Sequence, residues 1–213
     1  MKKLLFGLVA LTLMAPVSLE AQRTALSLSS GWKFGGTMGV NLGDLNLAAA
    51  VPYSAQLAFR VRSDASTILM VEYQPTTLRL EPFGGGVNQE LFEMDVWYFM
   101  VGGEMEIIDR GPVVPFAIGT LGVAWFNPTG GSADRGSETM FAGTFGGGAR
   151  VPLGQSNRVS LRLEGRLNLT IPFGGASVYC GSGSGCYTGF GGTIGPVQGA
   201  LYGGLRFALG PQL

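Results

Sequence analysis

The stretch of residues 158–171 alternates between polar and apolar residues over its whole length. Because successive side chains of a β-strand point to opposite faces, this pattern predicts a strand with one polar, charged face and one apolar face. Such a strand is longer than the strands of soluble domains, which usually have about five or six residues. It can cross a bilayer at a tilt, which takes about nine to eleven residues. The polar positions are Arg158, Ser160, Arg162, Glu164, Arg166, Asn168 and Thr170, and the apolar positions are Val159, Leu161, Leu163, Gly165, Leu167, Leu169 and Ile171.

The composition favours a membrane protein that crosses with strands. The chain is 46% hydrophobic and only 13% charged, whereas soluble domains carry about 25% charge. The most apolar internal run, residues 113–126, is interrupted by Pro115, Gly119 and Gly122 and is shorter than the roughly twenty residues of a spanning helix. Only helices and closed barrels satisfy their backbone groups in lipid, so the sequence predicts a barrel.

Residues 1–21 have the features of a secretory signal peptide. Lys2 and Lys3 precede an apolar core at residues 4–14, and a small residue, Ala21, stands at the expected cleavage site before Gln22. An uncleaved anchor helix is the alternative, but the apolar core is too short to span a bilayer. We therefore expect residues 22–213 to form a single barrel domain.

Eight amphipathic strands can be placed along the mature chain. Their connections alternate between short polar turns at 63–66, 109–112 and 154–157 and longer segments at 36–50, 82–91, 127–137 and 172–196. This alternation is typical of outer-membrane barrels, and an even strand number predicts both termini at the short-turn side, in the periplasm. The predicted strands are residues 25–35, 51–62, 67–81, 92–107, 113–126, 140–153, 158–171 and 197–209.

The polar–apolar alternation changes phase within two of these strands. In the third strand it inverts after Pro75, which puts Leu78 and Leu80 on the outer face, and we expect a bulge there or the emergence of the strand from the membrane. In the fourth it slips at Gly102 and Gly103. The fifth strand alternates too weakly to fix its facing.

The last strand resembles the C-terminal insertion signal of outer-membrane barrels, through Tyr202, Gly204, Phe207 and Leu209. It departs from that signal in having Leu209 where an aromatic residue is usual, and in the short tail at 210–213. Together with the strand count, the mature chain resembles the small eight-stranded outer-membrane barrels of the OmpA, OmpX and OmpW kind. The resemblance implies an all-β, eight-stranded antiparallel up-and-down transmembrane β-barrel in the outer membrane of a Gram-negative bacterium. It also implies insertion by the barrel-assembly machinery, long loops outside the cell and a monomer in lipid.

The strand phases predict a charged lumen. Eight strands leave an interior that side chains just fill, and charges buried there must be paired. The pairing admits two interpretations, a salt-bridged plug or a hydrated path with a weak preference for anions. Glu104 and Glu106 are the expected neutralisers of the arginines near the periplasmic end. The predicted lumen charges are Lys33, Arg60, Arg62, Glu72, Glu93, Asp95, Arg150, Arg162, Glu164, Arg166 and Arg206.

Aromatic residues on the opposite phase are expected to face lipid. Several of them should form the girdles found at the two membrane interfaces, although plain apolar surface is the alternative. The predicted lipid-facing aromatic residues are Trp32, Tyr53, Phe59, Tyr73, Tyr98, Phe141 and Phe207.

Cys180 and Cys186 are the two cysteines of the chain, and they lie in its longest connection. In a secreted protein, two cysteines this close together predict a disulfide, which should contribute roughly 2 kcal/mol by closing a small ring. Two thiolates without any histidine make a poor metal site.

The sequence does not predict an enzyme or a cofactor. It contains no histidine, and no Ser–Lys or carboxylate pair stands in a context that favours catalysis. The formal net charge of zero gives no reason to expect nucleic acid as a partner. Three functions stay open. They are a closed structural barrel whose outer loops contact an external partner, a narrow channel or carrier for small hydrophobic or anionic molecules with Met70, Trp97 and Phe99 as its wall, and a soluble periplasmic barrel of lipocalin type.

Overall fold

The computed structural model describes residues 24–40, 43–82, 89–107, 111–129, 136–154, 158–172, 177–181, 185–189 and 195–209. The predicted signal peptide lies outside these residues. Among them no helix is long and apolar enough to cross a membrane. The strands are β1 (Thr24–Lys33), β2 (Gly36–Val40), β3 (Gly43–Leu47), β4 (Tyr53–Arg60), β5 (Ala65–Pro82), β6 (Gln89–Glu106), β7 (Val114–Thr129), β8 (Glu138–Leu153), β9 (Val159–Pro172), β10 (Ser177–Gly181), β11 (Gly185–Gly189) and β12 (Val197–Ala208).

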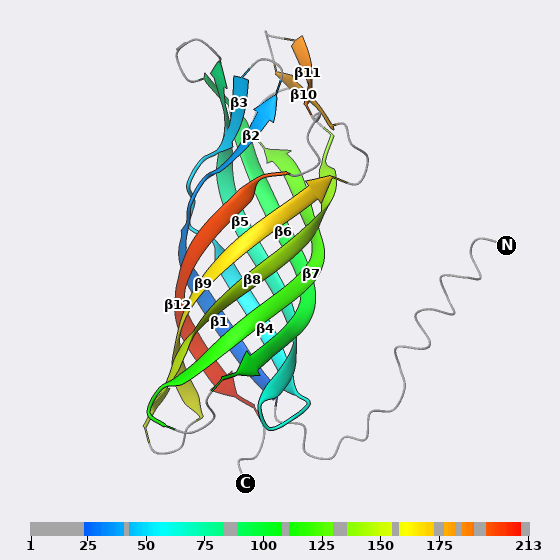
Figure 1. Cartoon of the computed structure of the whole chain (residues 1–213). Coiled ribbons are helices and arrows are strands. Elements are labelled where there is room, and N and C mark those ends of the chain that lie inside the picture. Colours follow the sequence, from blue (N-terminus) through cyan, green and yellow to red (C-terminus); the bar gives the residue numbers. More distant parts are fainter. Residues whose placement is uncertain are drawn as a thin grey trace, which may run out of the picture.

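Eight tilted strands close into an antiparallel barrel, which confirms the predicted fold class (Figure 1). Its wall runs β1–β4–β5–β6–β7–β8–β9–β12 and returns to β1. The amide of Leu209 donates to the carbonyl of Thr24 at 2.7 Å, so β1 begins where β12 ends. We call this the short-turn end, because the connections β4–β5, β6–β7 and β8–β9 also lie there. The other end carries the β2–β3 and β10–β11 hairpins, and we call it the hairpin end.

The β2–β3 hairpin corrects the prediction that residues 36–50 form a loop. β3 pairs with the last residues of β5, from Leu47 opposite Leu78 to Gly43 opposite Pro82, and so extends the barrel wall. Leu45 and Leu47 are both buried and point to the same side as Leu78. Gly, Asp and Asn in the pattern G-D-L-N-L are common turn residues, so this segment does not stand out as a strand from its sequence alone.

β5 does not change phase at Pro75, so the predicted bulge was wrong, whereas the alternative, that the strand leaves the membrane there, stays a prediction. Its even-numbered residues point inward along the whole strand, from Ser66 through Glu72 to Leu78 and Leu80. The register irregularity of the β5–β6 pair falls later, between Leu78 and Arg79. The chemistry of the interior changes along β5 while the facing of the strand does not.

β6 shows the same behaviour and corrects the slip predicted at Gly102 and Gly103. Met94, Tyr98 and Glu104 all point inward on one uninterrupted phase. The facing of β7 could not be predicted from its weak alternation; in the structure Phe116 and Thr120 are buried and define its inner face.

Two chemically different halves make up the barrel interior. Towards the hairpin end, apolar side chains of β3, β5, β6, β7 and β8 form one core. Towards the short-turn end the buried residues are largely charged. The apolar core comprises Leu45, Leu47, Met70, Leu78, Leu80, Phe92, Met94, Val96, Tyr98, Met100, Ala124, Phe126, Met140 and Ala142.

Candidate functional site

Four charged residues from β1, β5 and β9 form a buried chain of ion pairs in the middle of the barrel. Lys33 Nζ lies 2.6 Å from Glu72 Oε1, and the second oxygen of Glu72 accepts a hydrogen bond from Arg166 Nη1 at 2.9 Å. Arg166 Nε in turn donates to Glu164 Oε1 at 2.6 Å. The Lys33 side chain is fully buried. These four residues are called the inner cluster, and their two positive and two negative charges balance.

A second group of charges lies nearer the short-turn end. Arg162 Nη1 and Arg206 Nη1 donate to the two oxygens of Glu104, at 2.6 and 2.7 Å. Arg150 Nη2 lies 2.5 Å from Glu106 Oε1, and Arg60 pairs with the same carboxylate. The mouth cluster consists of Arg60, Glu104, Glu106, Arg150, Arg162 and Arg206.

Glu164 joins the two clusters into one network. Its Oε2 accepts from Arg162 Nε at 2.8 Å while Oε1 is held by Arg166. Glu164 extends from β9 between these two arginines, because residues two apart on a strand share a face. Hydrogen-bonded charge pairs of this kind are what makes a buried ion tolerable.

Aromatic rings cover the cations that have the least access to water. Lys33 Nζ lies 4.0 Å from the ring centroid of Tyr98, and the guanidinium of Arg166 lies 4.1 Å from that of Tyr202. The guanidinium of Arg162 lies 4.0 Å from the Phe116 ring. Each ring supplies a cation–π contact and keeps the charged layer tightly packed.

Most of the predicted lumen charges lie in this network. Glu104 and Glu106, expected as neutralisers, are its central carboxylates at the short-turn end. The members that the sequence had placed in the lumen are Lys33, Arg60, Glu72, Arg150, Arg162, Glu164, Arg166 and Arg206.

Three of the predicted lumen charges lie elsewhere, and that part of the prediction was wrong. Arg62 is in the β4–β5 turn, where its side chain is 78% exposed and lies 3.8 Å from Asp64. Glu93 and Asp95 face outward on β6, and Tyr73 donates a hydrogen bond to Asp95 Oδ1 at 2.8 Å. Their acidic character suggested the lumen, but this part of the wall is polar outside and apolar inside.

The structure also reveals a row of neutral polar residues that sequence reasoning did not single out. Thr120, Thr144, Asn168 and Gln198 stand opposite one another on β7, β8, β9 and β12, and all are buried. Thr144 donates to Asn168 at 2.7 Å, and Tyr98 reaches across to Gln198 at 3.1 Å. The alternation within each strand could have predicted that these residues face inward. Only the register between the strands shows that the four residues form a row.

Aromatic residues follow one another across the outer wall. Tyr53, Tyr73, Trp97 and Trp125 occupy directly paired positions on β4, β5, β6 and β7. The rings of Tyr73 and Trp97 lie 4.7 Å apart. Such a row is typical of a membrane interface. Tyr98, predicted to face lipid, is instead buried inside the barrel.

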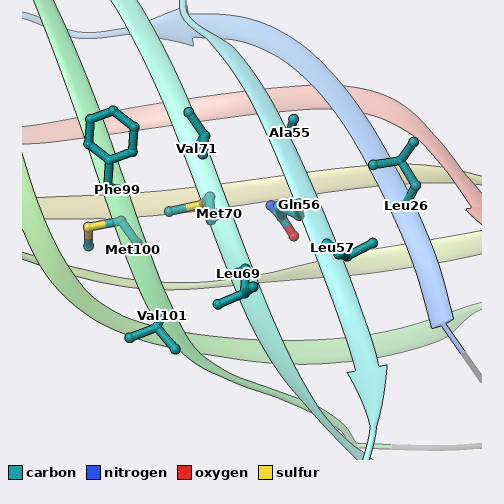
Figure 2. A pocket seen from close by; sticks show the side chains of 10 residues that line it. All are labelled: Leu26, Ala55, Gln56, Leu57, Leu69, Met70, Val71, Phe99, Met100 and Val101. Atoms are coloured by element: carbon teal, nitrogen blue, oxygen red, sulfur yellow. The ribbon is translucent and has the colours of Figure 1, made fainter. Parts of the chain in front are cut away.

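The outer wall carries an apolar groove of about 450 Å³ across β1, β4, β5 and β6 (Figure 2). Ala55, Val71 and Phe99 form one register row of the groove, and Leu57, Leu69 and Val101 form the next. Phe99 is 46% exposed, so it and Trp97 cannot line a lumen as predicted, whereas Met70 does point inward. With apolar residues outside and charged residues inside, the soluble lipocalin-type interpretation is also wrong.

The remaining predicted features lie on the hairpin end and on the last strand. Cys180 and Cys186 are paired positions of the β10–β11 hairpin, but their side chains lie outside the described residues and the disulfide stays a prediction. In β12, Tyr202 points into the barrel, and Leu209, directly after the strand, is exposed on the outside. Whether the segment is an insertion signal also stays a prediction.

The closed eight-stranded wall, apolar outside and charged inside, defines the fold of a small outer-membrane β-barrel. No protein-family model matches the chain, and no curated protein sequence matches it. Among solved structures, it is similar to Neisserial surface protein A, with a TM-score of 0.57 and 12% identity over 87% of this chain and 96% of that one. It is also similar to the outer membrane protein AlkL in lipid bilayers, with a TM-score of 0.52 and 12% identity over 93% and 96%. At these identities the likeness shows the fold.

Proposed function

We propose that this protein is an integral outer-membrane barrel with a closed lumen, which acts as a structural element or contacts external surfaces through the connections at its hairpin end. The observation that carries the proposal is that both halves of the interior are filled, each in its own way. Charged side chains paired with one another occupy the half near the short-turn end. Apolar side chains occupy the other half.

The apolar core supports the closed lumen most directly. Leu47, Leu78 and Phe92 come from three different strands and are each at most 7% exposed. A hydrated ion that crossed the layer of Leu47, Leu78 and Phe92 would exchange water for mainly apolar side chains. Loss of hydration without full compensation is costly, at about 2–7 kcal/mol even for an uncharged polar group. Even if water entered the network of charged residues, the apolar core would still block the passage of ions through the lumen.

The orientation proposed is termini in the periplasm and hairpins outside the cell. The supporting observation is a polar pocket of about 560 Å³ on the outer wall of β5 and β6, lined by Thr77, Arg79, Glu93 and Asp95. It lies beyond the aromatic row towards the hairpin end, so the wall there is suited to water rather than lipid. A barrel that projects past the membrane at one end presents its loops for contact at that end.

Single-channel conductance of the refolded mature chain, residues 22–213, in a planar bilayer tests the closed lumen. We expect no conductance steps from protein that shows the heat-dependent gel shift of a folded barrel. The gel shift is the control, because unfolded protein would also fail to conduct. Reproducible steps with a preference for anions would refute the closed barrel and favour the narrow path.

The second candidate, a narrow path that prefers anions, has one observation in its favour. The described residues of the mouth cluster include four guanidinium groups and two carboxylates, so positive charge is in excess at that end. A carrier for hydrophobic molecules is less favoured, because its proposed wall residues do not line one cavity. Met70 faces the barrel interior, whereas Trp97 and Phe99 face outward. No catalytic chemistry is proposed.

Tryptophan fluorescence gives a separate test of the membrane location. All three tryptophans of the chain, Trp32, Trp97 and Trp125, lie on the outer wall. In vesicles that contain brominated phospholipids we expect most of the fluorescence to be quenched, because the indoles contact lipid directly. Emission that is insensitive to the brominated lipid would contradict the proposed location. Soluble iodide should quench little in the same sample.

A further inference from the structure

The excess of positive charge in the lumen is confined to the mouth cluster. In the inner cluster two cations face two carboxylates, whereas in the mouth cluster Glu104 and Glu106 face four arginines. Glu164 also contacts Arg162, but it is shared with Arg166. Arginine stays protonated in proteins, so the surplus cannot be removed by loss of a proton. The mouth cluster therefore favours a negatively charged group that the described residues do not supply.

Two buried arginine N–H groups mark the place where such a group would bind. Arg150 Nε and Arg162 Nη2 find no acceptor among the described residues, although neither atom is accessible from outside. The two arginines stand directly opposite each other on β8 and β9. An unsatisfied buried donor costs free energy, and more so when it carries charge.

The Phe116 ring forms one wall of this place. It lies 4.0 Å from the guanidinium carbon of Arg162 and 5.7 Å from that of Arg150. The ring cannot accept hydrogen bonds from the edges of two guanidiniums as a carboxylate would. It therefore leaves Arg150 Nε and Arg162 Nη2 without an acceptor.

Solvent reaches the mouth cluster from the short-turn end. The side chains of Arg150 and Arg206 are 9% and 10% exposed, and that of Arg60 is 25% exposed. Arg162, at 1%, lies at the inner limit of the cluster. A small ion can therefore approach the cluster beside Arg206 from the short-turn end, without crossing the apolar core.

We propose that the mouth cluster is a binding site for one small anion, held by Arg150 Nε and Arg162 Nη2 beside Arg206. Guanidinium groups suit halides and oxyanions because their N–H groups form a fixed fork of charged donors. A bound anion offsets part of the surplus charge and satisfies both buried donors. The site does not require a conducting lumen, so it is compatible with the closed barrel and does not depend on it.

Crystals of the mature protein grown in sodium bromide test the site directly. We expect an anomalous bromide peak within hydrogen-bond distance of Arg150 Nε and Arg162 Nη2. In the Arg150→Gln variant the peak should disappear. This variant should still fold, because Glu106 keeps Arg60 while Glu104 keeps Arg162 and Arg206. Arg79→Gln, in the exposed pair with Glu90 at the hairpin end, is the matched control and should keep the peak.

A thermal measurement in detergent provides the second readout. At constant ionic strength, replacing a large organic anion by bromide should raise the Tm of the parent protein and of Arg79→Gln, because a ligand that binds only the folded state stabilises it. The Tm of Arg150→Gln should not respond. Arg150→Lys keeps the charge but removes the Nε donor, and its response should also be reduced.

Water alone at the two donors in saturating bromide would overturn the proposal, and so would a bromide peak that is unchanged in Arg150→Gln. The conductance experiment tests the closed lumen, and its result does not depend on whether the anion site exists. A barrel that conducts but shows the bromide peak would refute the closed lumen and leave the anion site intact. A barrel that does not conduct and shows no bromide peak would support the closed lumen and refute the anion site.

Discussion

Replacement of Glu104 by glutamine is expected to lower the free energy of unfolding by about 3–5 kcal/mol. Glu104 is 2% exposed and is the hydrogen-bond acceptor for both Arg162 and Arg206, with Arg150 at 4.0 Å. Glutamine has nearly the same shape but no charge, so three arginines would keep only Glu106 and the shared Glu164 as counter-ions. The penalty arises from buried positive charge left without a partner, which exceeds the value of the lost attraction itself.

Urea unfolding in lipid vesicles, followed by the gel shift of the folded barrel, measures this loss. Glu90→Gln is the matched control, because Glu90 pairs with Arg79 at 2.7 Å but both side chains are well exposed. That change should cost at most about 1 kcal/mol. Adding Arg206→Gln to Glu104→Gln should restore part of the stability, and the double-mutant cycle gives the coupling between the two residues. A Glu104→Gln protein as stable as the control would show that the network does not stabilise the barrel.

The facing of a strand could be predicted wherever the barrel interior is polar and its exterior apolar. In β9, Arg162, Glu164 and Arg166 were assigned to the lumen from alternation alone, and all three are buried there. The same reasoning placed Lys33 and Trp32 on opposite sides of β1. In the middle of a membrane barrel, chemistry and facing coincide, so a two-residue period is sufficient.

The prediction failed towards the hairpin end, where the outer wall becomes polar. Beyond Tyr73 on β5 the interior becomes apolar, with Leu78 and Leu80 inside, and the exterior becomes polar, with Arg79 outside. The chemical pattern inverts while the strand geometry is unchanged. Of the two explanations that the sequence offered, a bulge or the emergence of the strand from the membrane, only the bulge requires a change of facing, and the bulge is wrong. Glu93 and Asp95 on β6 were misplaced for the same reason. An inverted pattern without Gly or an extra residue is better interpreted as a strand leaving the membrane.

The candidate site needed the register as well as the facing. Arg206 and Glu104 are 102 residues apart, and Arg162 and Glu104 are 58 apart, yet both pairs are in direct contact. Alternation shows that these side chains enter the lumen, but not at which height along the barrel axis. The height depends on the stagger between strands, which no local pattern reports. The pairing of the charges, and thus the surplus at the mouth, becomes visible only in the closed barrel.

Replacement of Gly102 by alanine is the second change expected to have a large effect, with a loss of about 3 kcal/mol in unfolding free energy or failure to insert. A Cβ atom at Gly102 would lie 2.1 Å from the carbonyl oxygen of Gly119 and 2.6 Å from Cα of Thr120. Both are backbone atoms of β7, so the strand itself would have to move. Gly122 faces the same seam from β7, where a Cβ would lie 2.0 Å from the carbonyl oxygen of Phe99. β6 and β7 therefore approach closely here only because both positions are glycine.

Gly103→Ala is the control for this argument, one residue along the same strand. The nearest atom to a Cβ at Gly103 is the carbonyl oxygen of Ser66 at 3.8 Å, an ordinary contact. This change should alter stability by at most about 1 kcal/mol, and it can be stabilising because alanine restricts the unfolded chain more than glycine does. Folding yield into vesicles and the urea midpoint distinguish the two variants. Equal behaviour of Gly102→Ala and Gly103→Ala would mean that the β6–β7 seam can widen, and then the closure of this barrel would not depend on its inward glycines.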